Sequence, residues 1–534
     1  MHNVREDYEQ EWRNISRFAQ PARSRFLGTK ADKGEKRRFW NNRLKDSHGI
    51  EAFRTLANGL TSGLSSPSRP WYALRLPDED LNEQPGVREY LADVERRMYA
   101  FLASTNFYGS VKAGYAELGL FGTEACVMVE HPAAGAVCHA LTAGEYWIAL
   151  SDAMTPDTLL RESWMSARQM VQSFGSEVPE TVRKAAEKDS ERSIRVWNLI
   201  EPNPTFDKTR LGSKPWRSIY WCDEGHSDDL LAVQGYAEQP FWAPRWDVVG
   251  GDTYGVSPGM EALPALRELQ VQAARRNEAI DFMVKPEKAV PPGLRLTGQP
   301  GRVVSANGVT QDQVVIPYQM PYQAVDAVGQ EMDKCKSQID SLSFADLFNA
   351  ITNMRGIQPR NMEEIASRNE EKLTQLGPVI ERVSNEKLEI VIDRTFGIMQ
   401  RGGLLPPVPE ALANQRIDVE FVSILQQMQR AVGVGQIERG ASFAGNTAGV
   451  APEVLDNFNF DEMAREYADR IGLPANAVRS MKQVEEIRGK RAQQQQAQQA
   501  AEMADPMKKG VEAAALLAQT DLGGAPMLDQ LMGA

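Results

Sequence analysis

GGDTYGVSP, residues 250–258, opens the stretch that decides the fold, which runs from Gly250 to Asn361. Its glycines and proline end an extended segment, and Ser257 is placed to cap a helix whose first residue is Pro258, where a missing N–H costs nothing. The apolar spacing that follows predicts a helix over residues 257–284, kinked or truly begun at Pro264. At 1.5 Å per residue this rod is about 30 Å long.

A second rod follows after an interruption. Residues 285–322 are rich in Pro, Gly and Val, which predicts short strands and turns. A helix is predicted over residues 323–349, because apolar residues recur there at helical spacing: Val325, Val328, Met332, Ile339 and Leu342. Residues 350–361 break the pattern before a third helix begins at Asn361. The stretch therefore predicts two rods joined by a β-rich cap at one end and by a loop at the other.

The chain before this stretch predicts an α+β module. Amphipathic spacing indicates helices before Pro21, over Ser47–Leu64 and over Val87–Ser104. Strands are predicted at Ala125–Val129, Ala136–Cys138 and Tyr146–Ala149, as one antiparallel meander. Helices are then expected at Thr158–Phe174 and Pro179–Lys188, and strands at Ile194–Ile200, Ser218–Cys222 and Leu230–Tyr236.

The chain after the stretch is predicted to be mainly helical. A long helix runs to about Arg401, and Gly377-Pro378 is expected to bend it sharply. A strand at Ile417–Val422 and a Gly/Ala-rich loop at Gly433–Gly449 follow. Residues 452–499 predict polar helices ending in a glutamine run, and Met503–Ala534 have weak periodicity, for which we expect disorder.

Length and composition restrict the class of protein. The 534 residues suggest three or four domains, and 42% hydrophobic with 25% charged residues is typical of a globular protein. No window has the ~18 apolar residues of a spanning helix, and the charged N-terminus does not resemble a signal peptide, so a cytosolic chain is expected. Four scattered cysteines without a CxxC pair argue against a disulfide framework.

The net charge of −12 bears on nucleic-acid binding. A protein that grips DNA phosphates over a wide surface is usually basic. An acidic chain that handles DNA therefore touches it at a few basic points or repels it, and the same charge also fits a protein that never meets DNA.

Catalytic patterns are weak. Gly255-Val256-Ser257-Pro258-Gly259 fits G-x-S-x-G, but the residue after the serine must donate its N–H to an oxyanion hole, and Pro258 has none. No P-loop sequence exists, so an ATP-driven motor is not encoded here. Cys126, His131, Cys138 and His139 lie near one hairpin, yet their spacing matches no standard zinc pattern and buried cysteines explain it equally well. We expect no cofactor and no enzyme activity.

Three longer segments carry a resemblance to a known family. These are SHGIEAFRTLANGLTSGLSSPSRPWYAL (47–74), the run from Gly235 to Gln270 that contains GGDTYGVSP, and MEEIASRNEEKLTQLGPVIERVSNEKLEIVIDRTFGIMQRGGLLP (362–406). Together with DRIGLPANAVRSMKQVEEIRGKRAQQQQ (469–496) they resemble, in order and spacing, the portal (head-to-tail connector) proteins of short-tailed, podovirus-type bacteriophages. The resemblance spans about Tyr8 to Gln499 and rests on no single motif.

The resemblance implies an α+β, mainly helical portal fold that assembles as a ring, of twelve subunits in that family. In the family's layout residues 1–256 and 362–450 form the wing, 257–284 and 323–349 the two stem helices, and 285–322 the clip. Residues 350–361 form the tunnel loop and 451–534 the crown, with the Gln-rich helix and a flexible tail.

Two sets of residues are candidates for the channel. Asp326, Asp333 and Asp340 recur every seven residues, so they lie near one helix face and are expected to form an acidic stripe on a channel wall, although an ordinary solvated face fits them as well. In the resembled family the loop after the second stem helix touches DNA. Its candidates here, for which simple solubility is the alternative, are Asn349, Asn353, Arg355, Gln358 and Arg360.

The implied function is the DNA channel at one capsid vertex, through which the genome is packaged and ejected. The implied partners are double-stranded DNA, the packaging ATPase (terminase) and then tail adaptor proteins at the clip, capsid or scaffold protein at the wing, and internal core proteins at the crown. No membrane is involved. The chain is expected in the virion, and in the host bacterial cytoplasm during assembly. The alternatives are another virion structural protein, such as a tail adaptor, and a hydrolase that uses Ser257.

Overall fold

The computed structural model describes residues 1–23, 44–82, 84–210, 212–224, 230–284, 321–352, 370–409, 412, 417–422, 425, 434–449, 451–470 and 484–494. The chain forms two compact units, Met1–Gly435 and Gln436–Ala534, each considered by itself.

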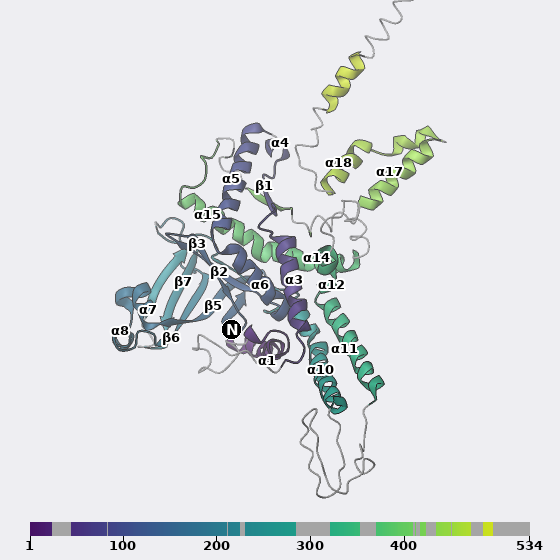
Figure 1. Cartoon of the computed structure of the whole chain (residues 1–534). Coiled ribbons are helices and arrows are strands. Elements are labelled where there is room, and N and C mark those ends of the chain that lie inside the picture. The colour runs from purple at the N-terminus through teal and green to yellow at the C-terminus, as the bar shows by residue number, and fades with distance from the viewer. Residues whose placement is uncertain are drawn as a thin grey trace, which may run out of the picture. The chain divides into compact units, whose positions relative to one another are not determined.

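The first unit combines helices with antiparallel sheets (Figure 1). Its helices are α1 (His2–Phe18), η1 (Pro21–Arg23), α3 (His48–Leu64), α4 (Glu79–Asn82), α5 (Pro85–Ser104), α6 (Phe107–Phe121), α7 (Ala167–Phe174), η3 (Gly175–Glu177), α8 (Glu180–Lys188), α9 (Pro258–Glu261), α10 (Leu263–Val284), α11 (Tyr322–Leu342), α12 (Ala345–Thr352), α14 (Glu370–Val383), η5 (Ser384–Leu388) and α15 (Glu389–Arg401). Its strands are β1 (Tyr72–Arg75), β2 (Ala125–His131), β3 (Gly135–Leu141), β4 (Tyr146–Leu150), β5 (Pro156–Ser166), β6 (Ser193–Pro202), β7 (Trp216–Cys222), β8 (Leu230–Tyr236), β9 (Phe241–Trp242) and β10 (Asp418–Phe421). The expected α+β class, rich in helix, is confirmed.

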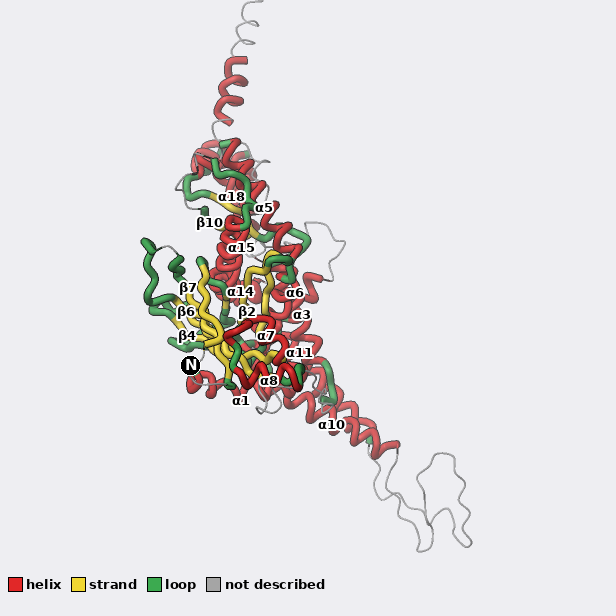
Figure 2. Tube along the Cα trace, turned by 90° about the vertical axis from the view of Figure 1, so that its left-hand side faces the viewer, coloured by secondary structure: helices red, strands yellow, loops and turns green. Residues whose placement is uncertain are grey.

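The strands form three sheets, with orders β1-β10, β3-β2-β9 and β4-β5-β6-β7-β8. The predicted hairpin of β2 and β3 is confirmed, but β4 does not continue that meander, because it pairs with β5 in the five-stranded sheet. Figure 2 shows this sheet as neighbouring yellow strands with α7 and α8 beside it.

The helix predicted over Thr158–Phe174 is wrong in its first half. Residues up to Ser166 form β5, a strand paired on both sides, and only α7 after it is helical. Two neighbouring strands outweigh local helix propensity there. Ser166 then caps α7, accepting the N–H of Gln169 while Gln169 reaches back to the Ser166 N–H.

The main core of the first unit contains a group of aromatic side chains around Trp12. Trp12 of α1 is fully buried, donates its indole N–H to Phe121 O at 3.1 Å, and packs edge-on against Tyr254 at 5.3 Å between ring centroids. The hydroxyl oxygen of Tyr254 in turn accepts the Ile148 N–H at 3.2 Å. The GGDTYGVSP turn is therefore anchored to helix α1, to α6 and to the five-stranded sheet.

The second unit is helical where it is described. It contains η7 (Pro452–Asn457), α18 (Phe460–Arg470), a helix over 484–494, and most of α17 (Val434–Ala448). The predicted Gly/Ala-rich loop is thus wrong: Ile437, Ala441, Ala444 and Ala448 recur at helical spacing, and Ala444 is fully buried. Arg488 forms a two-pronged ion pair with Asp461, at 2.6 and 2.7 Å.

Candidate functional site

Helices α10 and α11 run side by side in opposite directions, and residues 285–320 that join them lie outside the described residues (Figure 1). On α10 the buried residues end at Ala273, and on α11 the buried residues are Val325, Met332, Cys335 and Ile339. The predicted apolar stripe of α11 is confirmed, since Val328 and Leu342 are half-buried.

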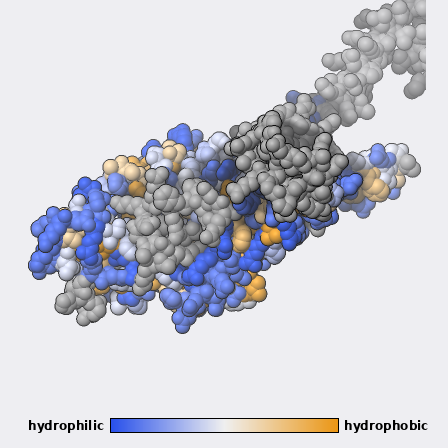
Figure 3. All heavy atoms as spheres, turned by 60° about the horizontal axis from the view of Figure 1, so that its bottom comes forward, coloured by the Kyte–Doolittle hydropathy of each residue, from blue (hydrophilic) through white to orange (hydrophobic). Residues whose placement is uncertain are grey.

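The far half of this helix pair is exposed. Ile280, seven residues after the buried Ala273 and so near the same face of α10, is 38% exposed, because among the described elements only α11 accompanies α10 there. Val284 and Tyr322, at the far ends of the two helices, are more than 70% exposed. The molecular face drawn in Figure 3 is mostly hydrophilic where it is described, with hydrophobic surface in small separate areas. The pair is therefore a projecting two-helix rod with no core of its own.

Ser257 begins the rod as predicted. Its Oγ accepts the Met260 N–H at 3.0 Å and donates to Leu120 O at 2.7 Å, and the residue is 1% exposed. Pro258 is the first residue of α9, and α10 begins at Leu263, next to Pro264. The hydroxyl is buried, donates its proton to Leu120 O and accepts the Met260 N–H, so the structure assigns Ser257 the role of a helix cap.

Replacing Ser257 with Ala is expected to destabilise the chain by about 1–2 kcal/mol, since it removes a helix cap and leaves the buried Leu120 carbonyl without a donor. Chemical denaturation followed by circular dichroism measures this. Ser257→Thr, which keeps a hydroxyl, is the control and should lose less. A Ser257→Ala protein as stable as the original chain would contradict the capping role.

The three aspartates of the predicted acidic stripe lie in two different environments. Asp326 and Asp333 are exposed on α11, and Asp326 accepts a hydrogen bond from Gln330 at 3.3 Å. Asp340 is half-buried, and its Oδ1 lies 2.9 Å from Nε2 of His48 at the start of α3. One turn away, Lys336 pairs with Asp46 at 3.2 Å. The first two carboxylates thus face solvent in the single chain, whereas the third attaches α11 to α3.

The second rod ends earlier than expected. A single helix was predicted to reach Asn349, but α11 stops at Leu342 and α12 begins at Ala345. Between them Phe344 takes a left-handed φ of 55° and packs its ring on Trp246, 5.9 Å between centroids. Asn349 is an exposed residue of α12. The other loop candidates, Asn353, Arg355, Gln358 and Arg360, lie outside the described residues.

The long helix is continuous through α14, η5 and α15. Pro378, expected to bend it sharply, lies within α14, which continues to Val383. The irregular part is η5, one turn of π-helix over Ser384–Leu388. Such turns carry one extra residue and are frequent at functional sites. This turn places two adjacent charged residues, Glu386 and Lys387, in the interior.

Lys387 forms an ion pair that is fully buried. Its Nζ lies 2.7 Å from Glu124 Oε2, both side chains are 0% exposed, and Nζ also sits 3.6 Å from the centre of the Tyr115 ring. Trp242 donates its indole N–H to the other carboxylate oxygen at 3.0 Å. Burial raises the pKa of Glu124 and lowers the pKa of Lys387, and the mutual attraction of the pair opposes both shifts. The pair joins the π-helical turn to the start of β2.

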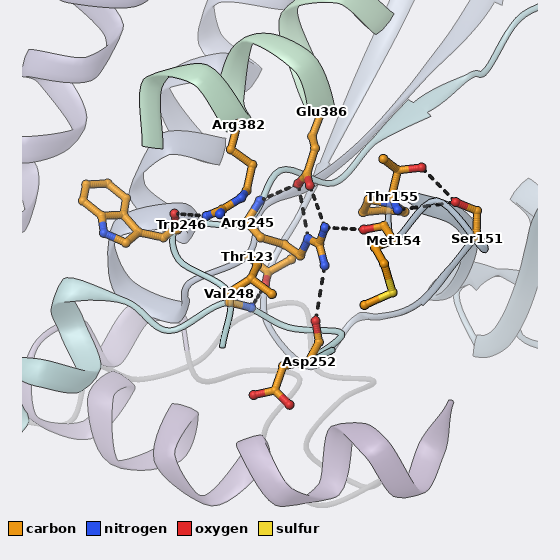
Figure 4. Close-up of polar contacts among 12 residues, drawn as sticks. Thr123, Ser151, Met154, Thr155, Arg245, Trp246, Val248, Asp252, Arg382 and Glu386 are labelled. Carbon is orange, nitrogen blue, oxygen red and sulfur yellow. Dashed lines mark hydrogen bonds and ion pairs between the residues drawn. The ribbon is translucent and has the colours of Figure 1, made fainter. Parts of the chain in front are cut away.

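Glu386 makes a second buried pair. Figure 4 shows Arg245 between the long helix and two loops. Its Nη2 lies 2.6 Å from Glu386 Oε1 and 2.7 Å from Met154 O, and its Nη1 donates to Asp252 O at 3.2 Å. Arg245 is 4% and Glu386 8% exposed. One guanidinium therefore holds loop 151–155, loop 247–254 and the π-helical turn together.

A third cluster fixes the C-terminal part of the long helix. Arg394 and Arg401 share Glu238 and Glu130: Arg394 lies 2.8 Å from Glu238, and Arg401 lies 2.8 Å from Glu130. Burial alone raises the pKa of Glu238, but hydrogen bonds from Arg401 and Arg394 outweigh it and lower that pKa. From Glu386 to Arg401 the long helix is thus attached to the sheets by ion pairs.

The buried charges Glu386 and Lys387 were not predicted, although the sequence contained a signal for them. Leu376, Val379, Ile380 and Val383 form an apolar stripe at helical spacing. The next two positions of that stripe are Glu386 and Lys387. Charged residues at core positions of an amphipathic helix need buried partners, although the sequence did not say that Arg245 and Glu124 provide them.

The suspected zinc ligands are not assembled. Cys126 and Cys138 are buried in the core, whereas His131 lies at the far end of β2 and accepts the N–H groups of Ala133 and Ala134 in its own turn. Burial lowers the pKa of His139. Within the described residues no group of three or more His, Cys, Asp or Glu side chains is arranged to hold a metal. Nor does that part of the chain contain a helix long and apolar enough to cross a membrane.

Known proteins match this sequence along nearly the whole chain. The family model described as "Bacteriophage head to tail connecting protein" matches residues 1–478. The chain is 34% identical over 530 residues to the "Probable portal protein" of Bordetella phage BPP-1, covering 97% of this chain and 93% of that protein. It is also 34% identical over 544 residues to the "Portal protein" of Salmonella phage epsilon15, covering 98% and 97%. Neither relative is named as an enzyme.

Two solved structures were also matched. One, "Neck of empty GTA particle computed with C6 symmetry", has a TM-score of 0.33 at 12% identity, over 74% of this chain and 86% of its own. The other, "Virion of native gene transfer agent (GTA) particle", has a TM-score of 0.34 at 12% identity, over 80% and 90%. The family match and the two phage relatives decide the classification: the chain belongs to the family of bacteriophage head-to-tail connecting proteins.

Proposed function

We propose that this chain is the portal protein of a short-tailed bacteriophage, and that copies of it form a ring around a DNA channel at one vertex of the capsid. The observation that carries the proposal is the 34% identity, over 97% or more of the chain, to two phage proteins named as portal proteins. The projecting rod of α10 and α11 supports it, because an exposed two-helix rod gains burial when neighbouring copies stand beside it.

The proposed regions follow the elements. Residues 1–256 and 362–450 form the wing, α10 and α11 the stem, and residues 285–322 the clip. Residues 350–361 form the tunnel loop, and residues 451–534 form the crown. The break at Phe344 makes α12 the link between stem and tunnel loop.

We assign the acidic stripe to the channel wall. In a ring with α11 on its inner side, Asp326 and Asp333 would repel DNA phosphates and keep the duplex from adhering. Asp340 belongs to the same face but pairs with His48, so its part is to hold α11 against α3.

Replacing Asp326 and Asp333 with Asn is expected to slow DNA translocation by several-fold while rings still assemble, because both side chains are exposed in the single chain. Packaging rate in purified procapsids measures this, with ring yield as the check on assembly. Glu331→Gln, on the same helix but already paired with Lys334, is the matched control. Unchanged packaging in the double Asn variant would count against a repelling wall.

Basic contacts with DNA are proposed for the tunnel loop. Arg355 and Arg360, with Asn349, Asn353 and Gln358, are the candidates, and among them the structure describes Asn349 alone. A loop that meets the duplex through two arginines in each copy touches few phosphates at a time, which suits movement better than tight binding.

The proposed partners are double-stranded DNA in the channel, the packaging ATPase and later tail adaptors at the clip, capsid or scaffold protein at the wing, and core proteins at the crown. The ring is proposed to contain twelve subunits and to reside in the virion after assembly in the host cytoplasm.

A complementation experiment tests the function. Procapsids assembled without this chain should fail to package DNA, and procapsids assembled with it should package and show it at one vertex by electron microscopy. Should it be found only on finished heads, after packaging is complete, the tail-adaptor alternative would hold instead.

A further inference from the structure

The five-stranded sheet has one face with an unusual composition. The register of the strands places Trp147, Leu160, Leu199, Ile219 and Val233 in one row across β4 to β8. Trp197 and Trp221 form the next row on the same face. We call the outer sheet face the surface made by Leu160, Trp197, Leu199, Ile219, Trp221 and Val233.

The outer sheet face belongs to no core. None of its six residues is part of either buried cluster; five are half-buried and Val233 is 63% exposed. On the opposite face Leu159, Val196 and Ile200 are at most 1% exposed. An antiparallel sheet with one solvated face normally carries polar side chains there. This face instead carries apolar side chains around one buried carboxylate, that of Glu162, which lies opposite Trp197 and is 1% exposed. An apolar area of this kind indicates a contact surface.

Its aromatic side chains are held in place before any partner arrives. The rings of Trp197 and Trp221 stack at 6.3 Å with 14° between their planes, and Trp147 lies 5.3 Å from Trp197. The Trp197 indole N–H is bonded to Asp223 at 2.7 Å. Docking on this face therefore costs little side-chain entropy.

Two arginines border the face and keep donors available. Arg195 binds Asp223 and Arg217 binds Glu201 through Nε, at 2.5 and 2.6 Å. Both also use Nη2 on the same carboxylate. Within the described part of the chain, no residue accepts a bond from either Nη1. The face thus combines apolar area with donors suited to a carboxylate.

The same unit carries a surface of matching chemistry. Met154 and Val249, which we call the apolar knob, are 45% and 60% exposed and belong to the two loops that Arg245 joins. Figure 4 shows Met154 beside Arg245. Met154 has a left-handed φ of 60°, an unfavourable conformation for methionine that the bond from Arg245 to its carbonyl supports. Exposed carboxylates surround the knob: Asp152, Asp247 and Asp252.

The two surfaces are placed for contact between copies and not within one chain. Met154 of the knob lies at the turn between β4 and β5, whereas Trp197 and Trp221 lie toward the other end of the sheet. Methionine packs well on aromatic rings, and carboxylates suit the free arginine donors. A ring requires two different complementary surfaces on each copy.

We propose that the outer sheet face is the surface on which the apolar knob of a second copy of this chain docks. The proposal rests on the ring arrangement proposed above. It names the residues of one contact between neighbours, and it makes that contact head-to-tail.

The test uses two full-length variants that each disable one side. Ile219→Glu with Val233→Glu places negative charge on the outer sheet face, and Val249→Glu does so on the knob. Each should raise the protein concentration at half-assembly by at least about 100-fold, because each places a negative charge without a partner in the buried contact. Gln234→Glu, an exposed neighbour of Val233 on the other side of β8, is the control and should assemble normally.

Mixing separates the possible results. The two variants mixed should form a dimer through the one intact contact and no ring, which native mass spectrometry detects; circular dichroism checks that each is folded. Rings of normal size from the sheet variant would overturn the proposal while leaving the portal function intact. If those rings also fail to enter procapsids, the face would instead bind another virion protein. Two folded monomers that never form the mixed dimer would also overturn it. If the unaltered chain forms no ring, the proposed function itself fails.

Discussion

Replacing Lys387 with Met should destabilise the first unit by about 3–5 kcal/mol, the cost of leaving a buried charge without its partner. Glu124 is 0% exposed, so without Lys387 it must be desolvated as a lone carboxylate or take up a proton. Urea denaturation followed by circular dichroism measures the loss. Lys334→Met, which breaks an exposed pair with Glu331, is the control and should leave stability nearly unchanged, because water screens exposed ion pairs.

The loss from Lys387→Met should also depend on pH. Without the lysine, burial and the nearby charge of Glu117 raise the pKa of Glu124 in the folded state, and the hydrogen bond from Trp242 opposes them. A raised folded pKa means that the folded chain binds the proton more tightly, so the variant loses stability as the pH rises above the ordinary carboxyl pKa of 4.5. The difference from the original chain should be larger at pH 8 than at pH 5. Adding Glu124→Gln should recover most of the loss, because no buried charge remains. A loss below about 1 kcal/mol would show that the pair is not buried.

Arg245→Met should have an effect of the same order, about 3–5 kcal/mol, because it strands Glu386 and leaves the carbonyls of Met154 and Asp252 without donors. Hydrogen exchange should become faster in residues 151–155 and 247–256 and in the π-helical turn, since one guanidinium joins all three. Both the free energy of unfolding and the exchange rates are to be measured.

Two further variants are compared with Arg245→Met: one keeps the positive charge, and the other removes a nearby arginine. Arg245→Lys keeps the charge but cannot bind a carboxylate and two carbonyls at once, so it should recover only part of the loss. Arg382→Met removes a partly exposed arginine that donates to Trp246 O nearby, and it should cost about 1 kcal/mol. If loop exchange is unchanged in Arg245→Met, then Arg245 does not hold the loops.

The sequence predicted elements well where local pattern and tertiary environment agree. Ser257 with Pro258 marked the start of the first rod, and the apolar stripe of α11 was found, because both depend on neighbours within one or two turns. The errors have tertiary causes. Residues 158–166 form β5 because β4 and β6 flank them, and α11 ends early because Phe344 packs on Trp246.

The candidate site was predictable only in part. Periodicity placed Asp326, Asp333 and Asp340 on one helix face, but it could not show that His48 would lie beside Asp340. The pairs Lys387–Glu124 and Arg245–Glu386 join residues that are 263 and 141 positions apart in the sequence. No local pattern contains such contacts. The resemblance to portal proteins came from order and spacing along the chain, which is why it held where single motifs were uninformative.

The central claim is that many copies of this chain stand side by side around a hole wide enough for a duplex. Electron microscopy of the purified full-length protein, with subunits counted in end-on views, tests it most directly. We expect closed rings of twelve subunits with an open centre wide enough for a DNA duplex. Monomers under every condition tried, or assemblies with a closed centre, would contradict it.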